Sequence, residues 1–311
     1  RPWHTFVIQL AHVPLRKLCR RVVRPIYIRT YLSRTEGFMD QIQNVSITDD
    51  VINEFHENGV AVIRGLFGPW VDGVREAIEE NKLNPSWRER TYKPENKNES
   101  EFFQDYCVWN NFAGYRALVV ESPMAQIAAQ LMRSKTAKIF HDHVLVKEPG
   151  NSVKTPWHHD QPYYIVDGQQ SVSFWVPLDM VPQERSIEFV AGSHQWGKDF
   201  KPKRFDGTDL YAEDGAEPVP EIDGCRDSFN IKSWATEPGD AIAFNFRTLH
   251  GAAANPSPDR RRVTSVRWVG DDARFVQRQG KTSPFFPDLD YRDGDPFGGE
   301  DFPLIFPKVS H

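Results

Sequence analysis

The spacing of apolar residues predicts helices in the first third of the chain. Residues 48–55 are typical of the beginning of a helix, and helices are also predicted from residue 70 to about 82 and over residues 124–132. Thr48 precedes two acidic residues and is expected to begin the first helix. Gly59 then leads into the alternating segment Val60–Ile63, which predicts an edge strand.

From Ala137 onward the pattern changes to short runs rich in Val, Ile, Phe and Trp. Turn signals separate these runs at 149–150, 167–168, 192 and 238–239. The 23 prolines and 13% aromatic residues also favour short strands over long helices. We therefore expect a mainly β (α+β) fold, a sandwich or barrel with flanking N-terminal helices. The polar, acidic stretch 206–227 is expected to loop out between strands.

The charge of the chain is unevenly distributed. Residues 1–35 contain eight Lys and Arg and no Asp or Glu, although the whole chain has a net charge of -5. We expect residues 1–44 to be a basic leader, either weakly packed or an organelle-targeting segment, and residues 45–311 to be a single domain. The expected location is the cytoplasm, or a mitochondrion or peroxisome if the leader is a targeting sequence.

The composition also narrows the classes of partner. A net negative charge without a basic groove argues against nucleic-acid binding, and no apolar run is long enough to cross a bilayer. Cys19, Cys107 and Cys225 are far apart and odd in number, which supports neither a disulfide framework nor a CxxC zinc site. We expect a small-molecule partner, and the pattern does not address the oligomeric state.

The segment 155–160, TPWHHD, contains the residues with the clearest chemistry. Residues i and i+2 of a strand project to the same face, so His158 and Asp160 are expected side by side while His159 points away. His250 ends an apolar run that begins at Ala241 and is the candidate third ligand. Two imidazoles and one carboxylate form the facial triad of non-haem iron(II) oxygenases, which leaves positions open for a co-substrate and O₂.

An arginine is the best partner for the far carboxylate of a co-substrate such as 2-oxoglutarate, because its guanidinium forms a bidentate fork. Arg260, Arg261 and Arg262 follow His250 by ten to twelve residues, a distance that lets the chain reverse toward the metal. Three consecutive arginines cannot all face inward. The spacing alone leaves open which of them faces the pocket.

These residues resemble the phytanoyl-CoA dioxygenase family of 2-oxoglutarate oxygenases. The likeness covers roughly residues 45–308 and rests on segments that occur in this order: FHENGV (55–60), HVLVK (143–147), HHD (158–160), FWVPLD (174–179), VAGSH (190–194), EPGD (237–240) and HG (250–251). The resemblance implies a double-stranded β-helix (jelly-roll, cupin-like) core. It also implies an Fe(II)- and 2-oxoglutarate-dependent dioxygenase that hydroxylates a small organic molecule and releases succinate and CO2.

The resemblance assigns roles residue by residue. His158, Asp160 and His250 match the iron ligands, and Arg261 matches the co-substrate anchor, with Arg262 as the fallback. Trp175 and His143 match positions that line the co-substrate pocket, although a core Trp and a hydrogen-bonded strand His are equally ordinary interpretations. Implied cofactors are Fe(II), 2-oxoglutarate and O₂, with ascorbate as a supporting reductant.

Substrate-facing groups are a separate set of expectations. The polar candidates next to these motifs are Gln161, Tyr163 and Asn110, for which surface exposure or core packing is the alternative. The departures from the family pattern are Ala252, where some relatives have Ser, and residues 185–187, RSI, where a glycine turn is usual.

Other sites and activities compete with this interpretation. His141 and His143 could form a rival cupin-type pair, against which the resemblance argues, and His194 matches a structural loop position. Asp160 occupies the position that a halide needs, so halogenation is disfavoured relative to hydroxylation, desaturation or ring formation. The remaining alternative is a catalytically silent or cupin-like metal-binding module of the same fold.

Overall fold

The computed structural model describes residues 45–92, 100–203, 208, 210, 215–280 and 282–308. The expected leader 1–44 and part of the acidic stretch 206–227 lie outside the described residues. From Val45 onward the chain groups into one compact unit. No helix of the described residues is long and apolar enough to cross a membrane.

Helices occupy the first part of this unit and strands the rest. The α-helices are α2 (Asp49–Asn58), α3 (Val71–Leu83), α4 (Ala113–Val120) and α5 (Met124–Met132). The strands are β1 (Val60–Ile63), β2 (Phe102–Tyr106), β3 (Ala137–Lys147), β4 (Thr155–His158), β5 (Val166–Asp167), β6 (Ser171–Pro177), β7 (Ile187–Val190), β8 (Ile231–Lys232), β9 (Ala241–Phe244), β10 (His250–Ala252), β11 (Arg261–Val269), β12 (Arg274–Phe275) and β13 (Leu304–Phe306). Short 3₁₀ turns are η1 (Gly68–Trp70), η2 (Gln161–Tyr163), η3 (Gln183–Arg185), η4 (Ser193–Gln195) and η5 (Asp223–Ser228).

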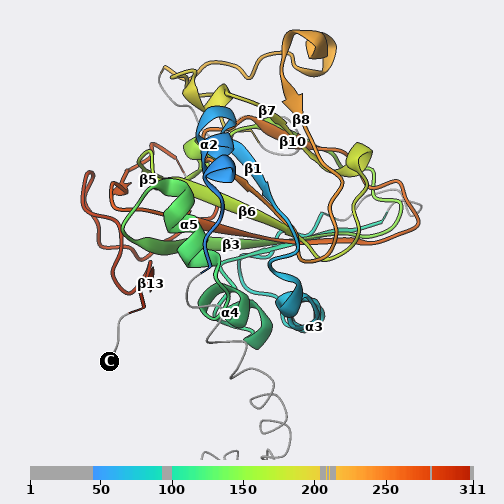
Figure 1. Ribbon diagram of the computed structural model, residues 1–311, viewed down its shortest axis with the longest axis horizontal. Coiled ribbons are helices and arrows are strands. Elements are labelled where there is room, and N and C mark those ends of the chain that lie inside the picture. Colours follow the sequence, from blue (N-terminus) through green and yellow to red (C-terminus); the bar gives the residue numbers. More distant parts are fainter. Residues whose placement is uncertain are drawn as a thin grey trace, which may run out of the picture. The chain divides into compact units, whose positions relative to one another are not determined.

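The strands form two main antiparallel sheets. The larger has the order β1-β9-β6-β11-β3-β13, with β2 also paired to β3, and the smaller has the order β4-β10-β7-β8. In Figure 1 the smaller sheet lies over one face of the larger, with α3 and α4 on the other side. This is the expected jelly-roll architecture, and its sheets do not close into a barrel. β5 and β12 form a separate two-stranded ribbon.

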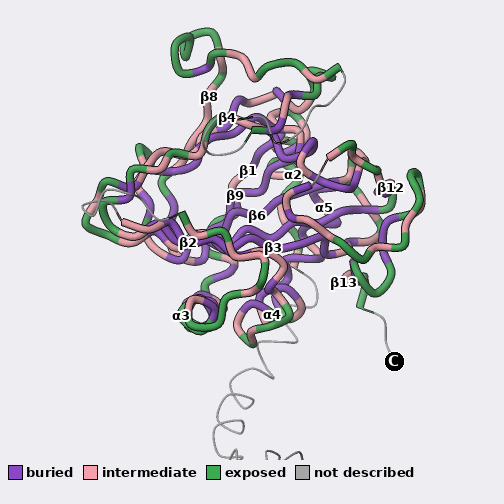
Figure 2. The backbone as a smooth tube through the Cα atoms, turned by 180° about the vertical axis from the view of Figure 1, so that it is seen from behind, coloured by how far each residue is buried: buried purple, intermediate pink, exposed green. Residues whose placement is uncertain are grey.

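The two faces of the larger sheet differ in chemistry. Its outer face packs under the helices in the main apolar cluster, which includes Val266 and Trp268 of β11 and Val144 and Val146 of β3. Figure 2 shows this sheet as the most continuously buried part of the chain. The alternate residues of β11 and β3 consequently face the smaller sheet, because strand side chains alternate between faces.

Three expected helices are confirmed, and a fourth was not anticipated. Thr48 stands at the start of α2, but its side chain makes no capping hydrogen bond; its backbone oxygen instead accepts from Val51 and Ile52. α3 begins at Val71, one residue later than expected. α4 was missed, although Tyr115, Leu118 and Val119 are its buried positions at helical spacing.

Gly59 joins the helical layer to the loop that leads into β10. Its φ of 74° is left-handed, and its carbonyl accepts hydrogen bonds from the Asn245 amide and the Thr248 hydroxyl. A Cβ at this position would meet Thr248 Oγ1 at 2.4 Å and His194 Nδ1 at 2.5 Å. Only glycine therefore fits both the backbone conformation and the space.

We expect Gly59→Ala to lower the free energy of unfolding by about 2–4 kcal/mol, because it adds left-handed strain to overpacking. Gly65→Ala is the matched control, since Gly65 also has a positive φ of 65° but a Cβ added there would meet no atom within 4 Å. That control should cost about 1 kcal/mol. Urea unfolding of both variants measures the difference, and equal losses would contradict the packing argument.

Candidate metal centre

Pairing of β4 with β10 brings together two histidines that are far apart in the sequence. His158 is the last residue of β4, His250 is the first of β10, and the two are direct partners in the antiparallel register. Asp160 lies two residues beyond His158, where its backbone amide donates to Phe246 O at 2.8 Å. The turn before His250 thereby holds the carboxylate residue in place.

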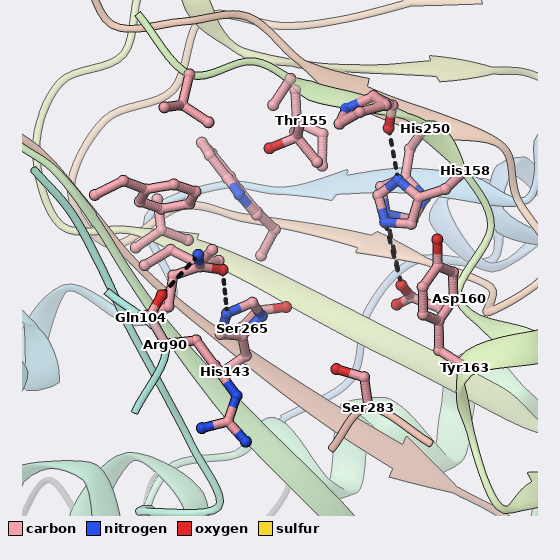
Figure 3. A pocket seen from close by; sticks show the side chains of 18 of the residues that line it. Arg90, Gln104, His143, Thr155, His158, Asp160, Tyr163, His250, Ser265 and Ser283 are labelled. Carbon is pink, nitrogen blue, oxygen red and sulfur yellow. Dashed lines mark hydrogen bonds and ion pairs between the residues drawn. The ribbon is translucent and has the colours of Figure 1, made fainter. Parts of the chain in front are cut away.

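The three side chains converge on one point, as Figure 3 shows. Asp160 Oδ1 lies 3.6 Å from His158 Nε2 and 3.8 Å from His250 Nε2. One ligand atom from each residue lies within 4.8 Å of the others, and this is the only such cluster of three among the described residues. The spacing suits a single ion with one nitrogen or oxygen ligand from each residue.

Both imidazoles are oriented through their other nitrogen. His158 Nδ1 lies 2.8 Å from Pro156 O, and His250 Nδ1 lies 2.9 Å from Thr248 O. Since a carbonyl only accepts, each Nδ1 carries the proton and each Nε2 presents its lone pair toward Asp160. This second hydrogen bond is the usual way in which proteins fix metal-binding histidines.

The electrostatics keep the ligands in the forms that bind a cation. Burial alone would raise the pKa of Asp160, but the Arg267 guanidinium and the two imidazoles outweigh it and lower that pKa to about 2. Burial, followed by the nearby His158, lowers the pKa of His250 to about 3. Near neutral pH the site therefore offers an ionised carboxylate and a neutral imidazole, as metal binding requires.

His159 points away from this cluster, as the strand alternation implies. Its side chain is buried against Phe200, and its Nε2 accepts a hydrogen bond from the Phe200 amide at 3.0 Å. His194 is also outside the site: its Nε2 lies 3.1 Å from His56 O.

A cavity of about 1030 Å³ adjoins the three residues. Of the residues expected near the co-substrate, Arg261, Trp175 and His143 all line it. His143 is buried, stacks on Tyr106 and lies 3.2 Å from Gln104 Oε1 through its Nε2. The rival pair of His141 and His143 also lines the cavity, but it belongs to no cluster of three ligands in the described part of the chain.

Only one of the three consecutive arginines faces the cavity. Arg261 is 7% exposed and donates to the backbone oxygens of Arg185 and Ala253, without an acidic partner among the described residues. Arg260 instead pairs with Glu148 and Glu79. Arg262 pairs with Asp179 at 2.7 Å. Of the three, Arg261 is therefore the one that is buried at the cavity without an acidic partner among the described residues.

Two of the three candidate substrate residues lie elsewhere. Gln161, the first residue of η2, is buried and does not line the cavity; its side-chain amide donates to Val166 O of β5. Asn110 is exposed in the turn before α4 and does not line the cavity. Neither residue therefore lines the cavity. Tyr163 does line the cavity, where its hydroxyl accepts from the Lys203 amide and donates to the Lys203 oxygen.

Sequence reasoning missed two buried basic side chains that line the cavity. Lys147 is the cross-strand partner of Arg261, is 3% exposed, and donates to the oxygens of Val153 and Ala253. Arg267 is buried with its Nε 3.5 Å from Asp160 Oδ2. Strand alternation could have identified Arg267, because it lies six residues from Arg261 on one strand and so shares its face.

We expect His158→Ala to weaken Fe(II) or Co(II) binding at least about 100-fold, because even partners outside the ligand set are worth 10–100-fold. The neighbouring His159→Asn is the control, and it should retain the metal while losing some stability. Anaerobic metal titration followed by absorption spectroscopy measures both. Comparable loss of metal in the two variants would show that the ligand lies on the opposite face of the strand.

Several solved structures share this fold. The carbocyclase SnoK from nogalamycin biosynthesis is 22% identical, with a TM-score of 0.63 over 83% of this chain and 96% of that chain. The epimerase SnoN, solved with Fe3+, alpha ketoglutarate and nogalamycin RO, is 20% identical, with a TM-score of 0.65 over 83% and 98%. EctD from S. alaskensis, in its apoform, is 17% identical, with a TM-score of 0.58 over 78% and 85%.

A comparison with curated proteins found no match to the chain. The family comparison is decisive: the model of phytanoyl-CoA dioxygenase (PhyH) matches residues 55–263, which is well over half of the chain. The matched range includes both strands of the candidate metal centre and ends within β11, just past Arg261. The chain therefore belongs to the phytanoyl-CoA dioxygenase family.

Proposed function

We propose that this protein is an Fe(II)- and 2-oxoglutarate-dependent dioxygenase that hydroxylates a small organic molecule. The observation that carries the proposal is the convergence of His158, Asp160 and His250 on one point at the wall of a large cavity. Two nitrogens and one carboxylate oxygen suit iron(II) and leave coordination positions open. Family membership and the Fe3+ and alpha ketoglutarate in the SnoN structure support the same chemistry.

Arg261 is the proposed anchor for the far carboxylate of 2-oxoglutarate. Its guanidinium is buried and has no acidic partner in the part of the chain that the structure describes, and Trp175 and Ile187 line the cavity with it. Ala252 also lines the cavity, so the hydroxyl that some relatives place there is absent here. Lys147 is the cross-strand partner of Arg261 and supplies further positive charge or hydrogen-bond donors at the Arg261 end of the cavity.

Residues next to the three ligand candidates orient Asp160 and shield His250 from water. Bound iron(II) and 2-oxoglutarate supply the oxidising chemistry, which consumes O₂ and releases succinate and CO2. Arg267 and Ser173 hold the outer oxygen of Asp160, at 3.5 and 3.3 Å, so that its other oxygen faces the imidazoles. Phe244 and Phe189 pack against His250, with ring centroids at 4.6 and 5.9 Å, and exclude water from that side.

The direct test is anaerobic loading with iron(II) and 2-oxoglutarate, followed by exposure to O₂ with a panel of small molecules. Formation of succinate that depends on the added molecule, together with a product heavier by one oxygen, is the expected result. His158→Ala should abolish it and His159→Asn should retain it. A product without added oxygen would point to the ring-forming or epimerising chemistry named for SnoK and SnoN.

We expect Arg261→Gln to weaken 2-oxoglutarate binding by about 2 kcal/mol or more, roughly 30-fold, because hydrogen bonds to a charged group are lost. Arg260→Gln is the control, since Arg260 pairs with Glu148 and Glu79 outside the cavity. Calorimetric titration of metal-loaded protein with 2-oxoglutarate measures both. Equal affinities in the two variants would remove Arg261 from the proposed role.

A further inference from the structure

The charge of the cavity wall is strongly one-sided. Seven Lys and Arg residues line it among the described residues, against the single carboxylate of Asp160. This contrasts with the chain as a whole, whose net charge is -5. A concave site with walls of one sign concentrates ligands of the opposite sign. The anchor Arg261 and its neighbour Lys147 account for only two of these cations.

A second set of polar groups lies at the other end of the same strand. We call His141, Ser265 and Arg267 the polar floor: they are 1%, 1% and 6% exposed, and all three line the cavity. His141 and Arg267 are cross-strand partners on β3 and β11, and Ser265 precedes Arg267 by two residues on the same face. The polar floor is thus one continuous patch of the larger sheet.

The polar floor has hydrogen-bonding capacity that the protein itself does not use. Ser265 Oγ and both ring nitrogens of His141 are buried without a partner among the described residues. Arg267 uses Nε toward Tyr164 and Asp160 and Nη1 toward Ser265 O, but no bond from Nη2 is found in that part of the chain. Buried polar groups are nearly always paired in folded proteins, so this concentration beside a cavity favours a binding role for the polar floor.

The polar floor is distinct from the end where 2-oxoglutarate is proposed to bind. Arg261 and Arg267 are six residues apart, or about 20 Å along the strand. Asp160 contacts Arg267 and not Arg261, so a co-substrate anchored at Arg261 would extend from the metal away from the polar floor and leave the polar floor to the substrate. In Figure 3, Ser283 lies below Asp160, and the side chain of Arg90 lies beside His143.

Charge balance indicates what the polar floor binds. If the proposed function holds, iron(II), the 2-oxoglutarate dianion, Asp160, Arg261 and Arg267 together retain one positive charge. Arg90 adds another at the cavity mouth, where its guanidinium donates only to a backbone oxygen, that of Glu89, among the described residues. Arg267 only donates, Ser265 can donate its O–H, and a neutral His141 donates from one ring nitrogen, so each residue of the polar floor can donate to an acceptor-only group.

The geometry points to a substrate that carries an oxyanion, a carboxylate or a phosphate ester, which the polar floor and Arg90 bind while the carbon to be oxidised lies near the metal. This inference rests on the proposed function, because the proposed co-substrate is what assigns the other end of the cavity. It narrows the substrate class to organic anions and gives Arg267 a second role beside positioning Asp160.

The test uses protein loaded with Zn(II) and saturating 2-oxoglutarate, with hexanoate, hexyl phosphate and neutral hexanamide as probes in ligand-observed NMR. At least one anion should bind about 10-fold more tightly than the amide without displacing 2-oxoglutarate, and the better anion identifies the group. Arg90→Gln and Ser265→Ala should each reduce this preference at least about threefold, and Arg267→Gln should remove it. Arg260→Gln, outside the cavity, should leave it unchanged.

Arg90 is exposed, and Ser265→Ala removes only one oxygen, so both variants are expected to fold. They therefore test the inference even if Arg267→Gln does not fold. Equal affinity for hexanamide, displacement of 2-oxoglutarate by the anions, or an unchanged preference in both variants would overturn the inference. Failure of 2-oxoglutarate to bind the wild type would instead count against the proposed function. The two failures are therefore distinguishable.

Discussion

The pairing of β4 with β10 is the contact on which the metal centre depends. It places His158 opposite His250, and the turn that precedes His250 also binds the backbone of Asp160 through Phe246. Because a one-residue slip in a strand moves every side chain to the other face, this register decides which of the adjacent histidines can be a ligand. The carbonyls that orient both imidazoles come from the same two segments.

The two faces of the larger sheet have different roles. Apolar residues of β3, β6 and β11 face outward under the helices, where they form the main hydrophobic cluster. The face toward the cavity carries His, Ser, Lys and Arg side chains at alternating positions. A β-sandwich ordinarily fills this interior with apolar groups. Here the apolar outer face supplies the hydrophobic core, so the inner face can carry polar side chains that line the cavity.

Buried basic side chains are the main electrostatic feature of the cavity, although burial holds the pKa of Lys147 well below its ordinary value. Arg261 and Lys147 are satisfied only by backbone oxygens among the described residues, and burial, followed by the charge of Arg185, lowers the pKa of Arg261 to about 10. An uncompensated buried charge destabilises a fold unless a partner of opposite sign is present. Such residues are expected where a ligand supplies the missing charge, so these positions are better explained by binding than by stability.

The sequence alone determined the fold class, the three metal-ligand candidates and the set of arginines that contains Arg261. These follow from local rules: strand alternation separates His158 and Asp160 from His159, and helical spacing locates α2, α3 and α5. The spacing left open which arginine faces inward and the resemblance favoured Arg261; the tertiary structure gives the physical reason, since Arg260 and Arg262 have acidic partners from distant segments. The tertiary structure also shows that Gln161 and Asn110 do not line the cavity, whereas Lys147, His141 and Arg267 do. Local patterns specify which face a side chain takes, but only long-range strand pairing specifies what that face meets.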